Sequence, residues 1–194
     1  MTPERIESAE QFAAALHQMV NEMEMAQTER NRASAASFAI TRDHHHAIVL
    51  LMKNTFYSSS FALLRCLFEA YLRALWLKYC ATDAQVTGFF SGDEPPKGMV
   101  AAIETTPAFT GKVLSRIKRE NWNAMCAFTH TGGLHLQRWQ SEDAIEPQFE
   151  AAELEECLNF VELFGAMATL ELKQMEKSGD SGATVMALMN MRWP

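Results

Sequence analysis

The sequence has few cysteines, and none of them forms a Cys-x-x-Cys unit. The four cysteines, at positions 66, 80, 126 and 157, are widely spaced and lie in apolar segments with helical spacing. A chain of 194 residues can bury enough surface to fold without a disulfide or a structural metal ion. We therefore expect free, mostly buried thiols, as in proteins of the reducing cytoplasm.

Signals for β-strands and for membrane segments are also missing. There is no sustained alternation of polar and apolar residues and no Asn-Gly or Asp-Gly hairpin turn. The most apolar region, residues 47–80, is interrupted by charged residues, so no run of about 18 apolar residues could span a bilayer. The acidic, polar start lacks the pattern of a signal peptide. These absences predict a soluble, cytoplasmic, all-α protein that does not contact membranes.

The common nucleotide-binding and hydrolase motifs do not occur. The sequence contains no Gly-x-x-x-x-Gly-Lys-Ser/Thr, no Gly-x-Gly-x-x-Gly and no Gly-x-Ser-x-Gly, which argues against the common nucleotide-dependent enzymes and against α/β-hydrolases. The net charge of -7 disfavours broad electrostatic attraction to nucleic acid, so we expect no DNA partner. Contact with RNA would require a local basic patch.

Helical spacing of apolar residues recurs along the chain. It predicts an up-and-down bundle of about five main helices, forming one domain over residues 1–177. Residues 178–194 are expected to form a linker and a Met-rich tail that docks on the body or on a partner. Ser8 is expected to cap the first long helix. A Pro/Gly-rich excursion at 82–107 is expected to hold short helices at 83–90 and 97–105. The predicted long helices cover residues 8–29, 33–53, 59–81, 111–128 and 148–177.

Arg65 is the first polar residue that a simple bundle does not require. At about 100° per residue, it falls on the flank of the apolar stripe of its helix, and Glu69 follows one turn later. The two can form an ion pair in a solvated ladder with Arg73. A partly buried arginine could instead bind a phosphate or carboxylate through two parallel hydrogen bonds.

A second candidate segment is Thr129-His130-Thr131-Gly132-Gly133. A histidine beside glycines at a helix end is accessible to a substrate, and its ordinary pKa suits proton transfer near neutral pH. The alternative is a capping or core histidine held by a carbonyl group. His135, Arg138 and Trp139 follow in the sequence and could line the same site.

Two further polar clusters have ordinary alternatives. His44, His45 and His46 are consecutive, so a regular helix points them about 100° apart and all three cannot bind one ion. One of them could bind a metal ion together with Asp43 or a partner elsewhere, which leaves a His-based metal enzyme as a weaker hypothesis. We expect a polar helix face here, with no metal and no cofactor. Arg116 and Arg119 belong to the densest basic cluster, which could hold RNA phosphates or could be a solvated helix face.

The segment from Phe61 to Trp76 carries the pattern Leu-Arg-x-Leu-x-Glu around Arg65. Later in the chain it is followed by Thr129-His130-Thr131-Gly132-Gly133 and by Arg138-Trp139. With these motifs, residues 43–139 resemble the HEPN superfamily. That superfamily includes abortive-infection and toxin ribonucleases whose sites usually form across a dimer. Its ribonucleases carry Arg-x(4–6)-His on one helix. This chain departs from the pattern because Arg119 is too far from His130 and Arg65 is on another helix.

The sequence therefore supports two hypotheses of function. In the first, a homodimeric, HEPN-like protein of a defence or toxin system binds or cleaves RNA without a metal ion. His130 would act as general acid/base, Arg65 would stabilise the phosphoryl charge and Glu69 would orient one of them. Arg116, Arg119, His135, Arg138 and Trp139 would contact the substrate. In the second, the chain is a non-enzymatic module that binds a partner or a small ligand.

Overall fold

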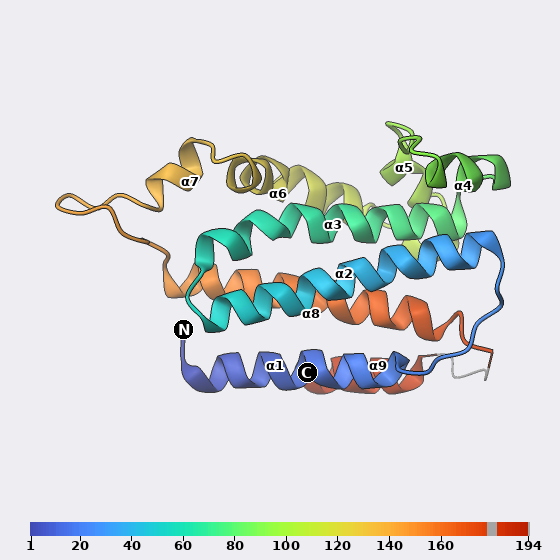
Figure 1. Cartoon of the computed structure of the whole chain (residues 1–194), viewed down its shortest axis with the longest axis horizontal. Coiled ribbons are helices and arrows are strands. Elements are labelled where there is room, and N and C mark those ends of the chain that lie inside the picture. Colours follow the sequence, from blue (N-terminus) through green and yellow to red (C-terminus); the bar gives the residue numbers. More distant parts are fainter. Residues whose placement is uncertain (178–181, 194) are drawn as a thin grey trace.

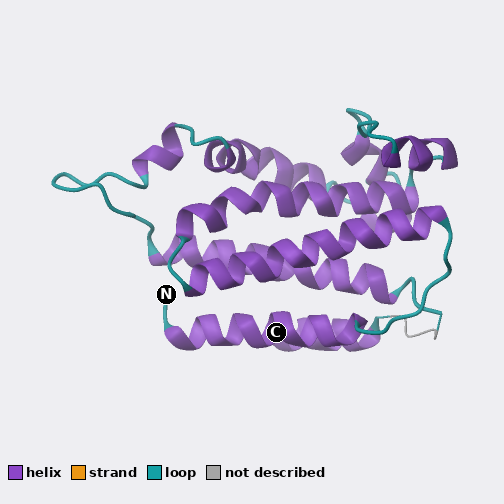
Figure 2. Cartoon of the chain, viewed as in Figure 1, coloured by secondary structure: helices purple, strands orange, loops and turns teal. Residues whose placement is uncertain are grey.

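The computed structural model describes residues 1–177 and 182–193, and this part of the chain is a helical bundle. It contains no strand, only an isolated antiparallel bridge between Met25 and Glu176 (Figure 2). The predicted all-α class and the five main helices are confirmed. The long helices are α1 (Pro3–Val20), α2 (Glu29–Lys53), α3 (Tyr57–Tyr79), α6 (Val113–Thr129) and α8 (Ala151–Lys173) (Figure 1).

The long helices are arranged around the antiparallel pair α2 and α3 (Figure 1). The helix α1 packs on α2 and α8 along one side of the molecule, and α6 packs on α3 along the opposite side. The stripe predicted for α3 is buried as its spacing indicates, with Leu67, Phe68, Tyr71 and Leu75 at its centre. α3 is thus a central helix whose outer face receives α6.

Both ends of the first helix were predicted wrongly. It begins at Pro3, because the side chain of Thr2 accepts a hydrogen bond from the Arg5 amide at 3.3 Å and proline is well suited to a first helical position. Ser8 lies inside the helix. The helix ends at Val20, and Glu22 then adopts a left-handed backbone with φ of 60°, so a connection replaces the last predicted turns.

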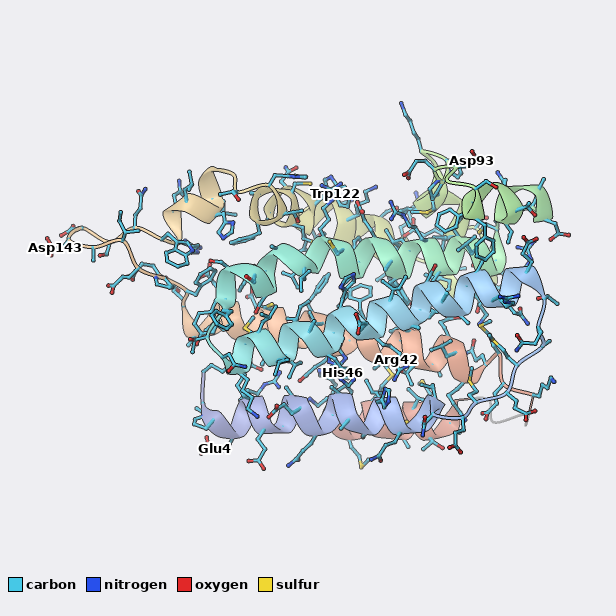
Figure 3. All side chains as sticks on the ribbon, viewed as in Figure 1. Glu4, Arg42, His46, Asp93, Trp122 and Asp143 are labelled. Atoms are coloured by element: carbon cyan, nitrogen blue, oxygen red, sulfur yellow. The ribbon has the colours of Figure 1, made fainter. Side chains whose placement is uncertain are left out.

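The short helices lie at two ends of the α3–α6 face. The expected helices of the excursion are present as α4 (Asp83–Phe90) and α5 (Met99–Ile103), followed by the 3₁₀ turn η1 (Pro107–Phe109). The short helix α7 (Gly133–Gln137) follows α6 and was not predicted. From α7 the chain runs out in a loop away from the body before it returns as α8; Asp143 marks this loop in Figure 3.

The C-terminal segment forms the helix α9 (Ala183–Arg192), which docks on the body. Val185 is fully buried against Phe12, Leu16 and Ala166 of α1 and α8. The beginning of the expected linker, residues 178–181, lies outside the described residues. Across residues 1–177 and 182–193, no helix is both long and apolar enough to cross a membrane.

Charged residues occur inside the layer formed by α1, α2, α8 and α9. Figure 3 shows Arg42 and His46 between α1 and α2. Glu162 of α8 has no exposed surface and pairs with Arg5 at 2.8 Å and with Arg192 at 2.6 Å. These ion pairs link α1, α8 and α9 by bonds between charged groups that are shielded from solvent.

Candidate functional site on α3 and α6

Arg65 and Glu69 form an ion pair on the face of α3 that meets α6. The Arg65 Nε donates to Glu69 Oε1 at 3.0 Å, and each side chain is 25% exposed. Desolvation lowers the pKa of Arg65, but the hydrogen bond and charge of Glu69 raise it by more, so the net shift is upward. The guanidinium is therefore a fixed cation in a half-buried position.

His130 lies at the C-terminal end of α6, where its helix is tied to α3. The Thr129 hydroxyl lies 3.1 Å from the carbonyl oxygen of Ala62 in α3 and 2.8 Å from that of Met125. This anchoring places the His130 Nε2 at 2.7 Å from the Arg65 Nη1. Because an arginine only donates, this contact is a hydrogen bond in the tautomer that carries its proton on Nδ1 and leaves Nε2 as the acceptor.

The turn after His130 explains the paired glycines. Thr131 has a left-handed backbone with φ of 53°, and a Cβ added at Gly132 would lie 3.2 Å from the Ala127 Cα. Gly132 therefore permits the close return of the chain onto α6. This turn ends the helix at His130 and leaves the imidazole exposed beside Arg65.

Trp122 completes the cluster and was not among the predicted site residues. The Arg65 guanidinium carbon lies 4.8 Å from the centre of the indole ring, and the Lys118 Nζ lies 4.7 Å from it. Both distances are within the range of cation–π contacts. Trp122 precedes His130 by about two helical turns, so the spacing on α6 could have placed both on one face. We call Arg65, Glu69, Trp122 and His130 the α3–α6 cluster.

A hollow of about 170 Å³ adjoins this cluster. Glu69, Arg73, Lys118 and Trp122 line one part of it, and the Pro95-Pro96 segment of the excursion lines another. Arg73 lies 3.8 Å from Glu69 and 3.6 Å from Glu94, so it is held between two carboxylates. The cluster is thus open to solvent on the side where cations and an aromatic ring meet.

A comparison with family models decides where the chain belongs. A family model matches residues 38–190. The chain belongs to DUF6988, a family of unknown function. The match includes every residue of the α3–α6 cluster and most of the bundle, and it begins within α2. Searches of curated proteins and of solved structures found no match.

The basic residues Arg116 and Arg119 lie nearer the start of α6 in this DUF6988 chain. Both are exposed, and Arg119 lies 3.6 Å from the neighbouring Glu120. They share α6 with Trp122 and His130 but take no part in the contacts of the cluster. A role in binding RNA phosphates stays a prediction.

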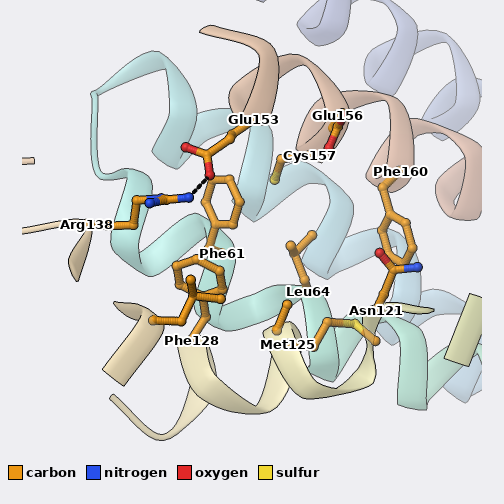
Figure 4. Close-up of a pocket in the computed structure, with 12 residues that line it drawn as sticks. Phe61, Leu64, Asn121, Met125, Phe128, Arg138, Glu153, Glu156, Cys157 and Phe160 are labelled. Carbon is orange, nitrogen blue, oxygen red and sulfur yellow. Dashed lines mark hydrogen bonds and ion pairs between the residues drawn. The ribbon is translucent and has the colours of Figure 1, made fainter. Parts of the chain in front are cut away.

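The structure gives His135, Arg138 and Trp139 partners outside the α3–α6 cluster. His135 Nδ1 lies 3.1 Å from the carbonyl oxygen of Phe128, Arg138 pairs with Glu153 of α8, and Trp139 donates to Ser58. The turn at Thr131 and Gly132 leads into α7, which carries His135, and the chain after α7 brings Arg138 and Trp139 to their other partners. Arg138 and Glu153 lie beside an apolar cavity instead (Figure 4).

The three consecutive histidines of α2 have different surroundings. His45 is buried against Gly165 of α8, where an added Cβ would lie 2.2 Å from its Nδ1. The His46 Nε2 lies 3.0 Å from the Ala13 carbonyl oxygen, and His44 is only partly buried. In the described part of the chain, no group of three His, Cys, Asp or Glu side chains is placed to hold a metal ion.

Proposed function

We propose that the α3–α6 cluster binds a phosphate of RNA and promotes metal-independent cleavage of the chain next to it. The observation that carries the proposal is the 2.7 Å contact between the Arg65 Nη1 and the His130 Nε2 on an exposed surface. A cation that can hold a phosphate lies directly beside a group that can accept a proton. The resemblance to HEPN ribonucleases favours the same class of substrate.

Arg65 has donors left for a ligand. Its Nε and Nη1 bond to Glu69 and His130, and Nη2 has no partner among the described residues. A phosphate could therefore accept hydrogen bonds from Nη2 and from Nη1, in the paired geometry that guanidinium groups favour. Drawing Nη1 towards the phosphate would free the lone pair on His130 Nε2.

The freed imidazole could then start the cleavage. His130 Nε2 takes the proton of the ribose 2′-hydroxyl, and the 2′-oxygen attacks the adjacent phosphorus. The bond from phosphorus to the 5′-oxygen breaks, which leaves a 2′,3′-cyclic phosphate and a 5′-hydroxyl. Arg65 stabilises the charge that develops on the phosphoryl oxygens, and Glu69 holds Arg65 in place. DNA lacks the attacking hydroxyl and would not be cleaved.

The departing 5′-oxygen needs a proton from a second group. The His130 of a second copy, protonated once its own Arg65 has moved to the phosphate, could supply it, so this proposal includes a homodimer with two α3–α6 clusters facing one RNA strand. Trp122 is partly exposed near Arg65, and a base that displaces one of the cations over its ring could stack on it. The adjoining hollow of about 170 Å³ could receive the sugar or base that follows.

Cleavage of a labelled RNA oligonucleotide in the presence of a chelator tests this proposal. We expect 2′,3′-cyclic phosphate ends from the RNA and no products from the same sequence in DNA. His130→Ala should slow cleavage by about 100-fold or more. The matched control, His44→Ala, replaces a histidine outside the cluster and should cleave as the wild type does.

An intact RNA after incubation with folded wild-type protein would contradict the catalytic part of the proposal. Equal cleavage by wild type and His130→Ala would contradict the role of His130. If the protein acts as a toxin, expression should slow bacterial growth with the wild-type sequence and have no effect with His130→Ala. Harmless expression of both would remove the toxin hypothesis.

A further inference from the structure

A cavity of about 210 Å³ lies between α3, α6, α7 and α8, and Trp122 is not among the residues that line it (Figure 4). α3 and α6 provide half of the residues that line it, including Phe61, Leu64, Met125 and Phe128. The Phe61 and Phe128 rings are 4.8 Å apart at their centres and tilted by 45°. An apolar cavity of about 150 Å³ is enough to bind benzene, so this one can hold a single ring with a short substituent.

The floor of the cavity is apolar on the α8 side as well. Cys157 is 3% exposed, and burial raises the pKa of its thiol, so it is a neutral, apolar wall. Phe160 adds another ring next to it. A bound molecule would therefore have to present an apolar, ring-sized body to this part of the site.

The charged residues at the cavity differ in whether they are already paired. Arg138 of the α7 end forms an ion pair with Glu153 of α8, as the dashed line in Figure 4 marks. Glu156 is exposed, and no residue in the described part of the chain forms a hydrogen bond or ion pair with it. Among the described charged residues that line the cavity, Glu156 is therefore the one without an ion-pair partner, while the Arg138 Nε is a buried donor without a hydrogen-bond partner.

We infer that this cavity is a binding site for a small amphipathic cation, with an aromatic or similarly sized apolar body and an amine at one end. The body would lie among Phe61, Phe128 and Phe160, and the ammonium group would face Glu156. The aromatic rings add attraction for a cation that lies over their faces. This site gives the ligand-binding hypothesis a location, and it is independent of RNA cleavage at the α3–α6 cluster.

Three probes that share one ring and differ in charge test the inference. 2-Phenylethylamine, 2-phenylacetamide and phenylacetate can each be titrated into the full chain at neutral pH, with binding followed by calorimetry or saturation-transfer NMR. We expect the amine to bind most tightly and phenylacetate most weakly. The separation should be roughly two- to fivefold per step, as for one exposed charge contact.

Two variants locate the binding. Glu156→Gln should weaken the amine to the affinity of the amide, while Glu155→Gln, which changes a neighbouring carboxylate that pairs with Arg5, should keep the preference. Ala124→Trp places a large side chain at the cavity wall and should remove binding of all three probes. Because Glu156→Gln changes an exposed residue, it keeps the test valid if Ala124→Trp does not fold.

Several results would overturn the inference. One is a wild-type protein that binds none of the probes, or that binds phenylethylamine and phenylacetate equally. Another is a Glu156→Gln variant that keeps the preference for the amine. A third is a folded Ala124→Trp variant that binds all three probes as the wild type does. RNA cleavage plays no part in these measurements, so loss or retention of that activity leaves their interpretation unchanged.

Discussion

Glu162 and Glu69 are both carboxylates paired with arginine, but their surroundings differ. Glu162 is fully buried, and Arg5 and Arg192 reach it from two other helices with side chains that are 17% and 19% exposed. Glu69 is 25% exposed and pairs with Arg65 of its own helix, which also contacts His130. The protein shields the ion pairs of Glu162 from solvent, whereas the ion pair of Glu69 leaves hydrogen-bond donors of Arg65 and the His130 imidazole accessible. We therefore expect the shielded network to contribute to folding and the accessible one to be available to a ligand.

The strongest test of this contrast is to remove the buried charge. Glu162→Gln leaves Arg192 in a shielded position without a compensating charge and leaves Arg5 with Glu155 alone, so we expect a loss of about 3–5 kcal/mol in the free energy of unfolding. Glu155→Gln removes a more exposed partner of Arg5 and should cost less than about 1 kcal/mol. Urea denaturation measures both. Equal losses would mean that burial does not distinguish the two carboxylates.

Acid should weaken the same buried layer through His45. Burial, and then the charges of His46, Arg42 and Arg192, lower the pKa of His45 from 6.5 to about 3. As the pH falls below 6.5, the unfolded chain binds a proton that the folded chain refuses until about pH 3, so stability is lost by up to a few kcal/mol across this window. Above pH 6.5 this contribution is absent.

The variant His45→Gln separates this effect from the titration of the carboxylates. Its free energy of unfolding should depend less steeply on pH between 6.5 and 3 than that of the wild type. Identical slopes in denaturant titrations at several pH values would show that His45 does not titrate abnormally in the folded chain.

The close approach of α8 to His45 should also be sensitive to a single methyl group. Gly165→Ala would place a Cβ 2.2 Å from the His45 Nδ1, so one of the two elements must move, and we expect a cost of about 1–3 kcal/mol. At Gly98 an added Cβ meets nothing within 4 Å. Thermal unfolding of Gly165→Ala and Gly98→Ala compares the two sites; a larger loss for Gly98→Ala would contradict the close packing of α8 on His45.

The smallest effect on stability is expected at the open cluster. Arg65→Ala removes an ion pair within one helix and a contact with His130, both partly solvated, and should lower stability by less than about 1 kcal/mol. The same change should greatly weaken RNA binding, measured by fluorescence anisotropy. A large loss of stability with unchanged RNA binding would make Arg65 a structural residue and would favour the non-enzymatic hypothesis.

The sequence predicted the helices better than their ends. Apolar spacing located α2, α3, α6 and α8, because burial of one stripe dominates the stability of a long helix. The beginning of α1 depends on a single hydrogen bond of Thr2, and its end on the backbone of Glu22, and neither has a strong pattern. The helix α9 was expected only as a tail, because its packing depends on long-range contacts of Val185.

The candidate site was predictable in part for the same reason. The spacing on α3 gave the Arg65–Glu69 pair, and the glycines after His130 indicated an accessible helix end. The contact between Arg65 and His130 requires α6 to pack on α3, which local patterns do not specify. Trp122 was missed as a site residue because a tryptophan at helical spacing is more often a core residue. His135, Arg138 and Trp139 were grouped with His130 by proximity in sequence, but α7 gives them other partners.

The most direct test of the central claim is histidine-selective ¹⁵N NMR during titration with an RNA oligonucleotide that carries 2′-deoxyribose at the cleavage position. The His130 signals can be assigned from the spectrum of His130→Ala. If a phosphate draws Arg65 away, the Nε2 resonance of His130 should shift on binding in the wild type and stay unchanged in Arg65→Ala, while the His45 signals stay constant in both. A His130 resonance that does not respond to saturating RNA would contradict the account.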